Sequence, residues 1–577
     1  DVVLDLDALA EAEDENWVWK GAVVNADYSK GLVQLSRGGK DATVIREFDL
    51  VAKRFVTEGT TAGFTVPEAK TFLDWIDDDT ILIGTDFGPF GQPGSLTESG
   101  YPAVVKRWHR GQSLAEATTV HEIDRSQVLL SPSVQRRPEG VYIHLIALPD
   151  FFTTEIHLLD PDSDRLQPVN LAPEVQFQCF FDGAALAILR ADWRGHRQGS
   201  LVALDLATDA LALIHQPDER SSIRRAVATR DAVVVDGLEN VVGGLYVTRP
   251  GVDGRWSMDR VPLNGLGTVE VVSASDDTIE CLVSYNDFLT PPSLLAFTTD
   301  DLQPRTLKSQ PARFDAGGLV AEQRFTTSAD GTQVPYFVVG HRAGPGPKRT
   351  LLYGYGGFEV SLTPGYAALT GRLWLERGGV YVVANIRGGG EFGPAWHQAA
   401  LKQNRHKAYE DFEAVARQLV ADGLTTPDRL AIRGGSNGGL LVGATFTRSP
   451  NLCAGVICAV PLLDMLRYHL LLAGASWMGE YGDPDDPVDG AYLASYSPFH
   501  QVTAEVDYPT VFVVTSTRDD RVHPGHARKM VARMLDQGHR LYYYENTEGG
   551  HAAGANLKQQ ARLAALEYVY LDKVLAD

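Results

Sequence analysis

The run Gly434-Gly435-Ser436-Asn437-Gly438-Gly439 lies between the apolar segment Leu430-Ala431-Ile432 and the small, apolar stretch Leu440-Leu441-Val442-Gly443-Ala444. This order predicts a strand, a glycine-rich reversal centred on one serine, and a helix. Only a very tight strand-to-helix turn lifts a serine hydroxyl clear of a sheet, and glycines on both sides tolerate the strained backbone. The helix that follows directs its N-terminal N–H groups to the place where an oxyanion would form. We therefore interpret the run as a nucleophile elbow with Ser436 as the nucleophile.

Length and charge limit the classes of protein to consider. A chain of 577 residues exceeds the size of one hydrophobic core, so we expect two or more large domains. The net charge of −22 disfavours nucleic acid or an anionic membrane as a partner. No apolar run approaches the length of a membrane span, and the acidic N-terminus lacks the basic region of a signal peptide. We expect a cytoplasmic protein, with the periplasm or secretion left open.

The cysteines and histidines form no metal-binding pattern. The four cysteines make no C-x-x-C pair, so we expect buried free thiols rather than a zinc site or a disulfide framework. His523 and His526 form an H-x-x-H pair, but no third ligand or metalloprotease glutamate accompanies them. The sequence therefore predicts neither a metal nor a cofactor.

The chain up to about residue 318 consists of short β-rich runs separated by turns, with almost no helical periodicity. Similar turns recur at a spacing of roughly 44 to 60 residues, close to the period of a β-propeller blade. Six such units are visible, which fits a propeller better than an array of β-sandwiches. The turns are Phe48-Asp49-Leu50, Trp108-His109-Arg110-Gly111, Leu159-Asp160-Pro161-Asp162, Leu204-Asp205-Leu206, Thr248-Arg249-Pro250-Gly251 and Phe297-Thr298-Thr299-Asp300.

From about residue 319 strands and helices alternate. A helix is predicted from Tyr409 to Val420, with Phe412, Val415 and Leu419 on one face. The strands are almost continuously apolar, which indicates a parallel sheet covered on both faces. They are expected at 335–339, 351–353, 380–384, 430–432, 454–460, 510–514 and 541–544. The two domains are therefore expected at 1–318 and 319–577.

A catalytic serine needs a base, and the base needs an acid that holds its tautomer. In α/β-hydrolases these partners follow the serine in the order acid, then histidine, on loops after later strands. Asp519 and Asp520 are the candidate acids, immediately after the strand that ends near Thr515. His551 is the candidate base, since it follows the strand 541–544 and has glycines beside it.

The oxyanion of such a reaction needs donors that are in place before the reaction. One is expected to be the backbone N–H of Asn437, the residue after the nucleophile. A second donor is expected from the loop Gly354-Tyr355-Gly356-Gly357-Phe358, whose glycines allow close approach and whose tyrosine carries a hydroxyl. A packed aromatic turn is an equal alternative for this loop.

Four motifs together resemble the prolyl oligopeptidase family of serine peptidases. They are Leu352-Tyr353-Gly354-Tyr355-Gly356-Gly357-Phe358, Ala384-Asn385-Ile386-Arg387-Gly388-Gly389-Gly390-Glu391-Phe392-Gly393, the elbow, and Asp519-Asp520-Arg521-Val522. The resemblance implies an α/β-hydrolase domain capped by an N-terminal β-propeller of about seven blades. It also implies cleavage of short proline-containing peptides on the carboxyl side of proline, without a cofactor. We expect a monomer whose propeller acts as a sieve.

The resemblance assigns roles to individual positions. Ser436, Asp519 and His551 are similar to the family's triad, and Tyr355 and Asn437 to its oxyanion donors. Aromatic and aliphatic side chains are expected to form the proline pocket, and an arginine to donate to a substrate carbonyl. These substrate-binding positions are Trp477, Tyr481, Phe358, Leu462, Val522 and Arg521. A flat proline ring can stack on an indole in such a dry pocket.

One part of the family's pattern is not found. The family starts with a segment that packs a helix on the hydrolase domain and contributes the first blade. The resemblance implies roughly a hundred such residues before Asp1, consistent with six visible blades instead of seven. Either this chain is shorter than its relatives or the sequence lacks these residues.

Other functions remain to be distinguished. A related serine oligopeptidase or hydrolase with a different preference at the residue before the cut is the nearest alternative. A dipeptidyl peptidase should carry a paired-glutamate motif, and no Glu-Glu dipeptide occurs in the chain. A propeller interaction module with an inactive hydrolase domain is the alternative from another class, against which the intact Ser436, Asp519 and His551 argue.

Overall fold

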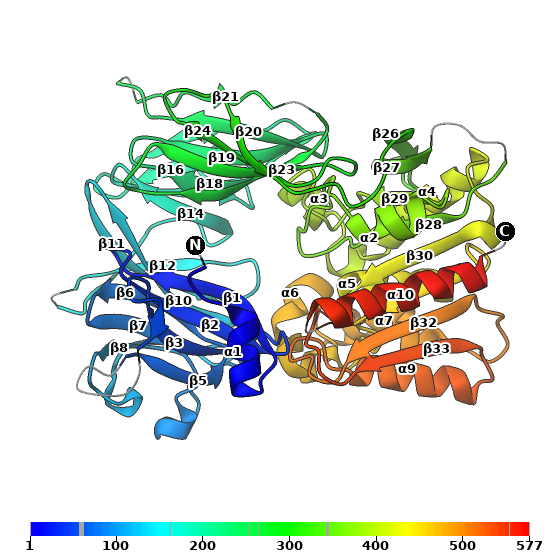
Figure 1. Ribbon diagram of the computed structural model, residues 1–577, viewed down its shortest axis with the longest axis horizontal. Helices are drawn as coiled ribbons and strands as arrows, with labels where there is room; N and C mark the ends of the chain where they lie inside the picture. Colours follow the sequence, from blue (N-terminus) through cyan, green and yellow to red (C-terminus); the bar gives the residue numbers. More distant parts are fainter. Residues whose placement is uncertain are drawn as a thin grey trace.

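The protein consists of a ring of small antiparallel sheets and an α/β domain, which lie side by side in the computed structural model (Figure 1). The structure describes residues 2–56, 63–161, 163–252, 254–263, 265–341, 346–552, 554 and 556–575. The ring is formed by the first half of the chain, and the α/β domain follows it with the site near the surface that faces the ring.

Six antiparallel sheets form the ring within the described residues. Sheet 1 comprises β1 (Trp17–Val24), β2 (Lys30–Arg37), β3 (Thr43–Asp49), β4 (Arg54–Phe55) and β5 (Thr65–Ala69). Sheet 2 comprises β6 (Phe72–Asp77), β7 (Thr80–Gly84), β8 (Val104–His109) and β9 (Thr118–Glu122), and sheet 3 comprises β10 (Leu129–Arg137), β11 (Gly140–Leu148), β12 (Glu155–Leu159) and β13 (Leu166–Pro168). Sheet 4 comprises β14 (Val175–Phe181), β15 (Ala184–Leu189), β16 (Leu201–Asp205) and β17 (Leu211–His215). Sheet 5 comprises β18 (Ser221–Ala228), β19 (Val233–Glu239), β20 (Val242–Thr248) and β21 (Asp259–Arg260), and sheet 6 comprises β22 (Thr268–Ala274), β23 (Glu280–Asn286), β24 (Ser293–Thr298) and β25 (Arg305–Ser309).

This ring is a β-propeller, because each sheet packs on the next through its first strand, in the order β1, β6, β10, β14, β18, β22. The turns that recur in the sequence lie at the end of the third strand of each sheet, so the predicted repeat is confirmed. The six units counted in the sequence are confirmed, whereas the family's usual number of about seven blades is not found within the described residues. Six sheets of roughly fifty residues each use all the strands between Trp17 and Ser309.

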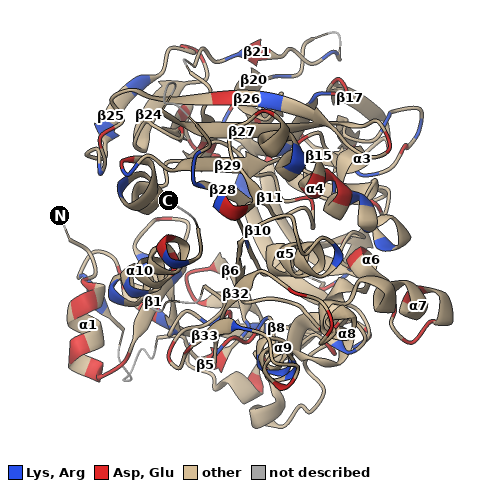
Figure 2. Ribbon diagram, turned by 90° about the vertical axis from the view of Figure 1, so that its right-hand side faces the viewer, with Lys and Arg blue, Asp and Glu red and all other residues tan. Residues whose placement is uncertain are grey.

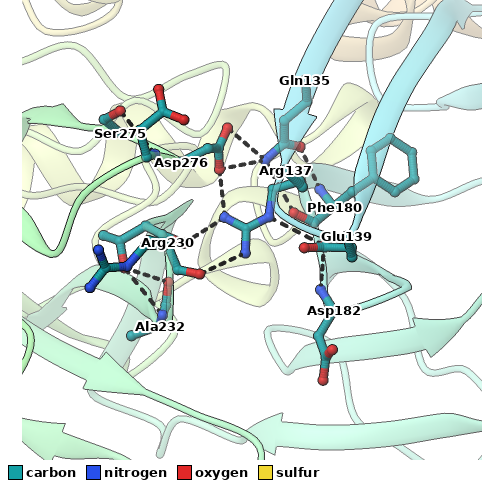
Figure 3. Close-up of polar contacts among 11 residues, drawn as sticks. Gln135, Arg137, Glu139, Phe180, Asp182, Arg230, Ala232, Ser275 and Asp276 are labelled. Carbon is teal, nitrogen blue, oxygen red and sulfur yellow. Dashed lines mark hydrogen bonds and ion pairs between the residues drawn. The ribbon is translucent and has the colours of Figure 1, made fainter.

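An arginine ties non-neighbouring sheets of the propeller together (Figure 3). Arg137, at the end of β10, is almost fully buried and donates to Asp276 Oδ1 at 2.6 Å and to the carbonyl oxygen of Thr229 at 2.5 Å. Asp276 belongs to the turn after β22 and Thr229 follows β18, so one side chain joins sheet 3 to sheets 5 and 6. Gln135 adds hydrogen bonds to Asp276 and to the carbonyl oxygen of Phe180 in sheet 4.

Removing this arginine should destabilise the propeller. Arg137→Met leaves the Asp276 carboxylate without its cation, and burial already raises the pKa of that carboxyl in spite of Arg137. Loss of one partner of a buried ion pair is expected to lower the free energy of unfolding by about 3 kcal/mol. Thermal and denaturant unfolding measure this. Arg194→Ala removes a half-exposed pair with Asp209 in sheet 4 and should change stability by less than about 0.5 kcal/mol. Equal losses in both variants would contradict the bridging role.

The second domain contains one eight-stranded sheet with the order β26-β27-β29-β28-β30-β31-β32-β33. The first two strands are antiparallel to their neighbours, and the strands from β29 through β28 to β33 are parallel. Its strands are β26 (Leu319–Thr327), β27 (Gln333–His341), β28 (Thr350–Tyr353), β29 (Val380–Ala384), β30 (Leu430–Gly435), β31 (Gly455–Ala459), β32 (Thr510–Ser516) and β33 (Leu541–Asn546). The predicted α/β-hydrolase type of sheet is confirmed.

Helices cover both faces of this sheet, because alternate residues of each buried strand contribute to two apolar cores. Helix α4 (His406–Ala421) packs with Phe412, Val415 and Leu419 on one face, as its periodicity predicts. Helices α5 (Asn437–Arg448) and α9 (Gly525–Asp536) join the same core. Helix α10 (Leu557–Val574) covers the opposite face with Tyr570 and Leu571.

Charged residues occur along the ribbon of both domains, and the N-terminal helix α1 (Leu6–Glu13) carries several acidic ones (Figure 2). The four cysteines are buried and free, as expected. Within the part of the chain that the structure describes, none of the helices has both the length and the apolar character that crossing a membrane requires.

Candidate active site

Ser436 occupies the reversal between β30 and α5. Its φ of 59° and ψ of −121° lie outside the regions that L-residues prefer, and its N–H donates to the carbonyl oxygen of Ala459 at 2.9 Å. Gly434 makes the reversal possible, because a Cβ there would lie 2.0 Å from the carbonyl oxygen of Gly438. The serine is half-buried, and its hydroxyl makes no hydrogen bond to another described residue. The strained turn therefore presents a free hydroxyl at the carboxyl end of the sheet.

Asp519 and His551 form a hydrogen-bonded pair after two neighbouring strands, β32 and β33. Nδ1 of His551 lies 2.7 Å from Oδ2 of Asp519, whose side chain is fully buried. Oδ1 of Asp519 accepts from the backbone N–H groups of Arg521 at 3.0 Å and Val522 at 2.9 Å. These two donors fix the carboxylate, which in turn orients the imidazole. Nε2 of His551 makes no hydrogen bond within the described residues, so the structure shows the aspartate–histidine contact but no hydrogen bond between His551 and Ser436.

Asp520, the other candidate acid, faces the propeller instead. Its carboxylate accepts from the backbone N–H groups of Asp41 at 2.9 Å and Ala42 at 3.0 Å, in the loop between β2 and β3. The structure therefore separates two adjacent aspartates that the sequence alone does not distinguish: Asp519 contacts the histidine, and Asp520 joins the two domains.

Asn437 and Tyr355 lie against each other beside the elbow. Nδ2 of Asn437 donates to the carbonyl oxygen of Tyr355 at 2.6 Å, a contact that joins the two residues but involves neither the backbone N–H of Asn437 nor the hydroxyl of Tyr355. Gly357 permits this contact, because a Cβ there would lie 2.5 Å from that Nδ2. The backbone N–H of Asn437 is in the first turn of α5, where no preceding turn accepts it. Burial raises the pKa of Tyr355 to about 12, so its hydroxyl keeps its proton for donation.

A buried charged cluster behind Asn437 was missed by sequence reasoning. Arg405 donates to Oδ1 of Asn437 and, at 2.6 Å, to Oε1 of Glu480. Oε2 of Glu480 accepts from Nε2 of His397 at 2.7 Å. Burial would lower the pKa of Arg405, but the charge of Glu480 raises it. Burial would raise the pKa of Glu480, but the hydrogen bond from His397 and the charge of Arg405 lower it. These side chains hold Asn437 in place. No local sequence pattern predicts that they lie together.

His397 extends this cluster to the propeller. Its Nδ1 lies 3.1 Å from a guanidinium nitrogen of Arg190, which also pairs with Glu359. Since a guanidinium only donates, Nδ1 is the accepting nitrogen and Nε2 carries the hydrogen that Glu480 accepts. Arg190 belongs to the loop between β15 and β16, so the propeller contributes to the support of the site.

The six expected substrate-binding residues divide into two groups. The five pocket residues gather in and against one apolar core beside the elbow. Phe358 lies edge-on to Tyr481, with 5.6 Å between ring centroids, and edge-on to Phe151 of the propeller at 5.2 Å. The hydroxyl of Tyr481 donates to Oδ1 of Asn437 at 2.8 Å, a second role that the sequence did not indicate. The buried members are Trp477, Tyr481, Leu462 and Val522.

Arg521, the sixth residue, contacts the propeller. Its guanidinium forms a two-point ion pair with Asp41, with N–O distances of 2.8 and 2.7 Å. The arginine side chain is nevertheless 45% exposed, so part of the guanidinium is available to a ligand. Within the described residues, no group of three or more histidine, cysteine, aspartate or glutamate side chains is arranged to hold a metal ion.

An elbow serine, an aspartate–histidine pair at neighbouring strand ends and N–H groups at a helix N-terminus are the parts of a serine hydrolase of the α/β class. Comparison with known proteins agrees. The profile of the prolyl oligopeptidase N-terminal β-propeller domain matches residues 1–310, and that of the prolyl oligopeptidase family matches residues 368–577. The chain belongs to the prolyl oligopeptidase family and is a serine-type peptidase.

Individual relatives support the same assignment. The uncharacterized peptidase y4nA of Sinorhizobium fredii is 42% identical over all of this chain and 81% of its own length. The prolyl endopeptidase of Elizabethkingia miricola is 39% identical over 52% of this chain and 43% of its own. The structure of a post-proline cleaving enzyme from Rickettsia typhi has a TM-score of 0.93 and 30% identity, over all of this chain and 86% of that one.

Proposed function

We propose that the protein is a serine endopeptidase that hydrolyses short peptides on the carboxyl side of proline. The observation that carries the proposal is the 2.7 Å contact between Asp519 and His551 at the strand ends that follow the elbow of Ser436. In this proposal Ser436 is the nucleophile, His551 the general base and Asp519 the acid that orients it. The two domains divide near residue 318.

The reaction proceeds through an acyl-enzyme. His551 takes the proton of Ser436 as its Oγ attacks the carbonyl carbon of the proline residue. The oxyanion that forms accepts from the N–H of Asn437 and the hydroxyl of Tyr355. The C–N bond then breaks, and His551 gives its proton to the leaving amine. Water hydrolyses the ester through the same histidine, which restores Ser436.

Preference for proline is supported by the apolar and aromatic side chains that pack around Trp477 and Tyr481, the positions that the family resemblance assigns to the proline pocket. A preference for a basic substrate residue would need a free carboxylate. Glu480 lies between Trp477 and Tyr481 in the sequence, but it is paired with Arg405 and His397 and is not free for such a residue. Similarity to a post-proline cleaving enzyme and to a prolyl endopeptidase favours the same preference. A related serine oligopeptidase with another preference is the alternative.

The remaining proposals concern the form in which the enzyme acts. The propeller over the site would restrict substrates to short peptides. We also propose a monomer in the cytoplasm, which fits four buried free thiols. Sedimentation and cell fractionation test these two points.

Removing the indole of Trp477 should selectively impair cleavage after proline. Trp477→Ala is expected to lower kcat/KM for a blocked Gly-Pro chromogenic peptide by about 100-fold, because the stacking surface for the ring is lost. The corresponding Gly-Ala peptide, which fills the pocket poorly, should lose less than about tenfold. Steady-state kinetics on both peptides give the ratio.

Trp477→Phe is the matched control, since it keeps an aromatic face and should retain most of the preference. Labelling of Ser436 by a fluorophosphonate shows that each variant remains folded around the elbow. A wild-type enzyme that ignores proline and cuts after arginine or alanine would overturn the specificity. A wild-type enzyme that the fluorophosphonate never labels at Ser436 would overturn the enzyme assignment itself.

A further inference from the structure

A cavity of about 390 Å³ lies between the first three propeller sheets and the loop that carries Arg521. Lys20 of β1 and Lys70, just before β6, contribute to its wall. Arg521 follows Asp519 by two residues and donates its backbone N–H to that carboxylate. The cavity therefore begins beside the acid of the candidate triad and extends into the propeller.

The cations of this cavity outnumber its carboxylates. Asp41 is the one acidic residue among the described lining residues, and Arg521 already binds it at two points. Lys20 and Lys70 form no ion pair within the described part of the chain. Burial would raise the pKa of Asp41, but Arg521 lowers it, and the charges of Lys70 and Lys20 act in the same direction. Both lysines are therefore close enough to act on a carboxylate in this cavity.

Lys70 is the more constrained of the two lysines. It is half-buried, its ammonium lies 4.2 Å from the ring centroid of Tyr101, and burial lowers its pKa. The charges of Asp520, Asp41 and Asp519 act on this ammonium and that of Arg521 opposes them, but none of these carboxylates forms an ion pair with it within the described residues. A partly desolvated ammonium that forms no ion pair gains more from an incoming anion than a hydrated one does. Among the lining residues, three cations against one carboxylate contrast with the net charge of −22 of the chain and with the acidic N-terminal helix α1 (Figure 2).

We propose that this cavity is a substrate subsite that binds a carboxylate of the peptide, through Lys70 and Lys20 with the exposed part of Arg521. The proposal rests on the proposed peptidase function. A peptide held at Ser436 and His551 passes Arg521, and its continuation enters the cavity. The enzyme then prefers peptides that carry an acidic group at a distance from the proline. The carboxylate is either an aspartate or glutamate side chain or the free C-terminus.

The test uses blocked peptides of one length with a single proline and with Glu, Gln or Lys at each position away from it. The ratio of kcat/KM for the Glu peptide to that for the Gln peptide is expected to reach about tenfold at low salt at one position and to fall as salt is added. The Lys peptide should be cleaved less well than the Gln peptide. The same peptides with a free or an amidated C-terminus distinguish the two sources of the carboxylate.

Lys70→Met and Lys20→Met should each reduce this ratio, and the double variant should bring it to about one. Lys30→Met makes the same change on β2 outside the cavity and should keep the ratio. The proposal is overturned if the Glu-to-Gln ratio of the wild type is near one at every position and for both C-termini. It is also overturned if the double variant keeps the wild-type ratio. Cleavage of the Gln peptide by wild type separately tests the proposed function, and if the enzyme prefers another residue before the cut, the ratio is measured on that peptide.

Discussion

Ser436→Ala should lower kcat for a blocked Gly-Pro peptide by about 10⁶-fold, because the variant has no atom that can form the acyl-enzyme. The strained φ of 59° belongs to Ser436 itself, but alanine has the same Cβ as serine and the glycines around the elbow leave room for the reversal, so alanine can occupy the same turn. The hydroxyl makes no hydrogen bond within the described residues, and its removal leaves no polar group unsatisfied. The thermal unfolding temperature should therefore stay unchanged.

Single-turnover and steady-state kinetics, together with fluorophosphonate labelling, measure the loss of activity. Ser516→Ala is a suitable control, because it removes another serine hydroxyl at the end of β32, close to the acid loop. The contact that Ser516 makes to Asp519 uses its carbonyl oxygen and survives the substitution. Activity in Ser436→Ala above a thousandth of wild type would show that another group is the nucleophile.

The sheet of the second domain could be predicted because its signals are local. The apolar strand 430–432 and the glycines after it specify the turn at Ser436, and the periodicity of Phe412, Val415 and Leu419 specifies the buried face of α4. A buried parallel strand is a short run of apolar residues, and an amphipathic helix has apolar residues three or four positions apart, so both can be recognised within a short stretch of sequence. The loops that carry Asp519 and His551 follow such strands directly, which is why their meeting could be expected.

The propeller was predictable as a repeat, and the six units visible in the sequence match the six sheets, whereas the resemblance to the family implied about seven blades. The recurring turn after the third strand of each sheet is a local feature, while the number of sheets in the ring depends on how the whole half-chain packs. The family's usual pattern led to about seven blades, and the structure contains six sheets between Trp17 and Ser309.

Ion pairs between distant segments were beyond sequence reasoning. Arg405 and Glu480 are 75 residues apart, Arg137 and Asp276 are 139 apart, and Asp41 and Arg521 are 480 apart. An arginine has the same appearance in a sequence whether its side chain is in water or in a buried cluster. The support of Asn437 and the basic cavity therefore became visible only when the fold brought these residues together.

Asp519→Asn should lower kcat by about 10⁴-fold with little change in KM. Two backbone N–H groups, of Arg521 and Val522, donate to one oxygen of this side chain, so the amide oxygen of asparagine must take that place. Its NH₂ group then faces Nδ1 of His551. Because two donors cannot face each other, the imidazole adopts the tautomer with its hydrogen on Nε2. A protonated Nε2 cannot accept the proton of Ser436.

Asp520→Asn provides the matched control one residue away. Its side chain accepts from Asp41 and Ala42 of the propeller and does not contact His551, so the substitution should change kcat by less than about tenfold. Steady-state kinetics on the Gly-Pro peptide and the rate of fluorophosphonate labelling should fall together in Asp519→Asn and remain near wild type in Asp520→Asn. The reverse result would make Asp520 the acid and would require a rearranged state in which the contact of Asp520 with the propeller at Asp41 and Ala42 is broken.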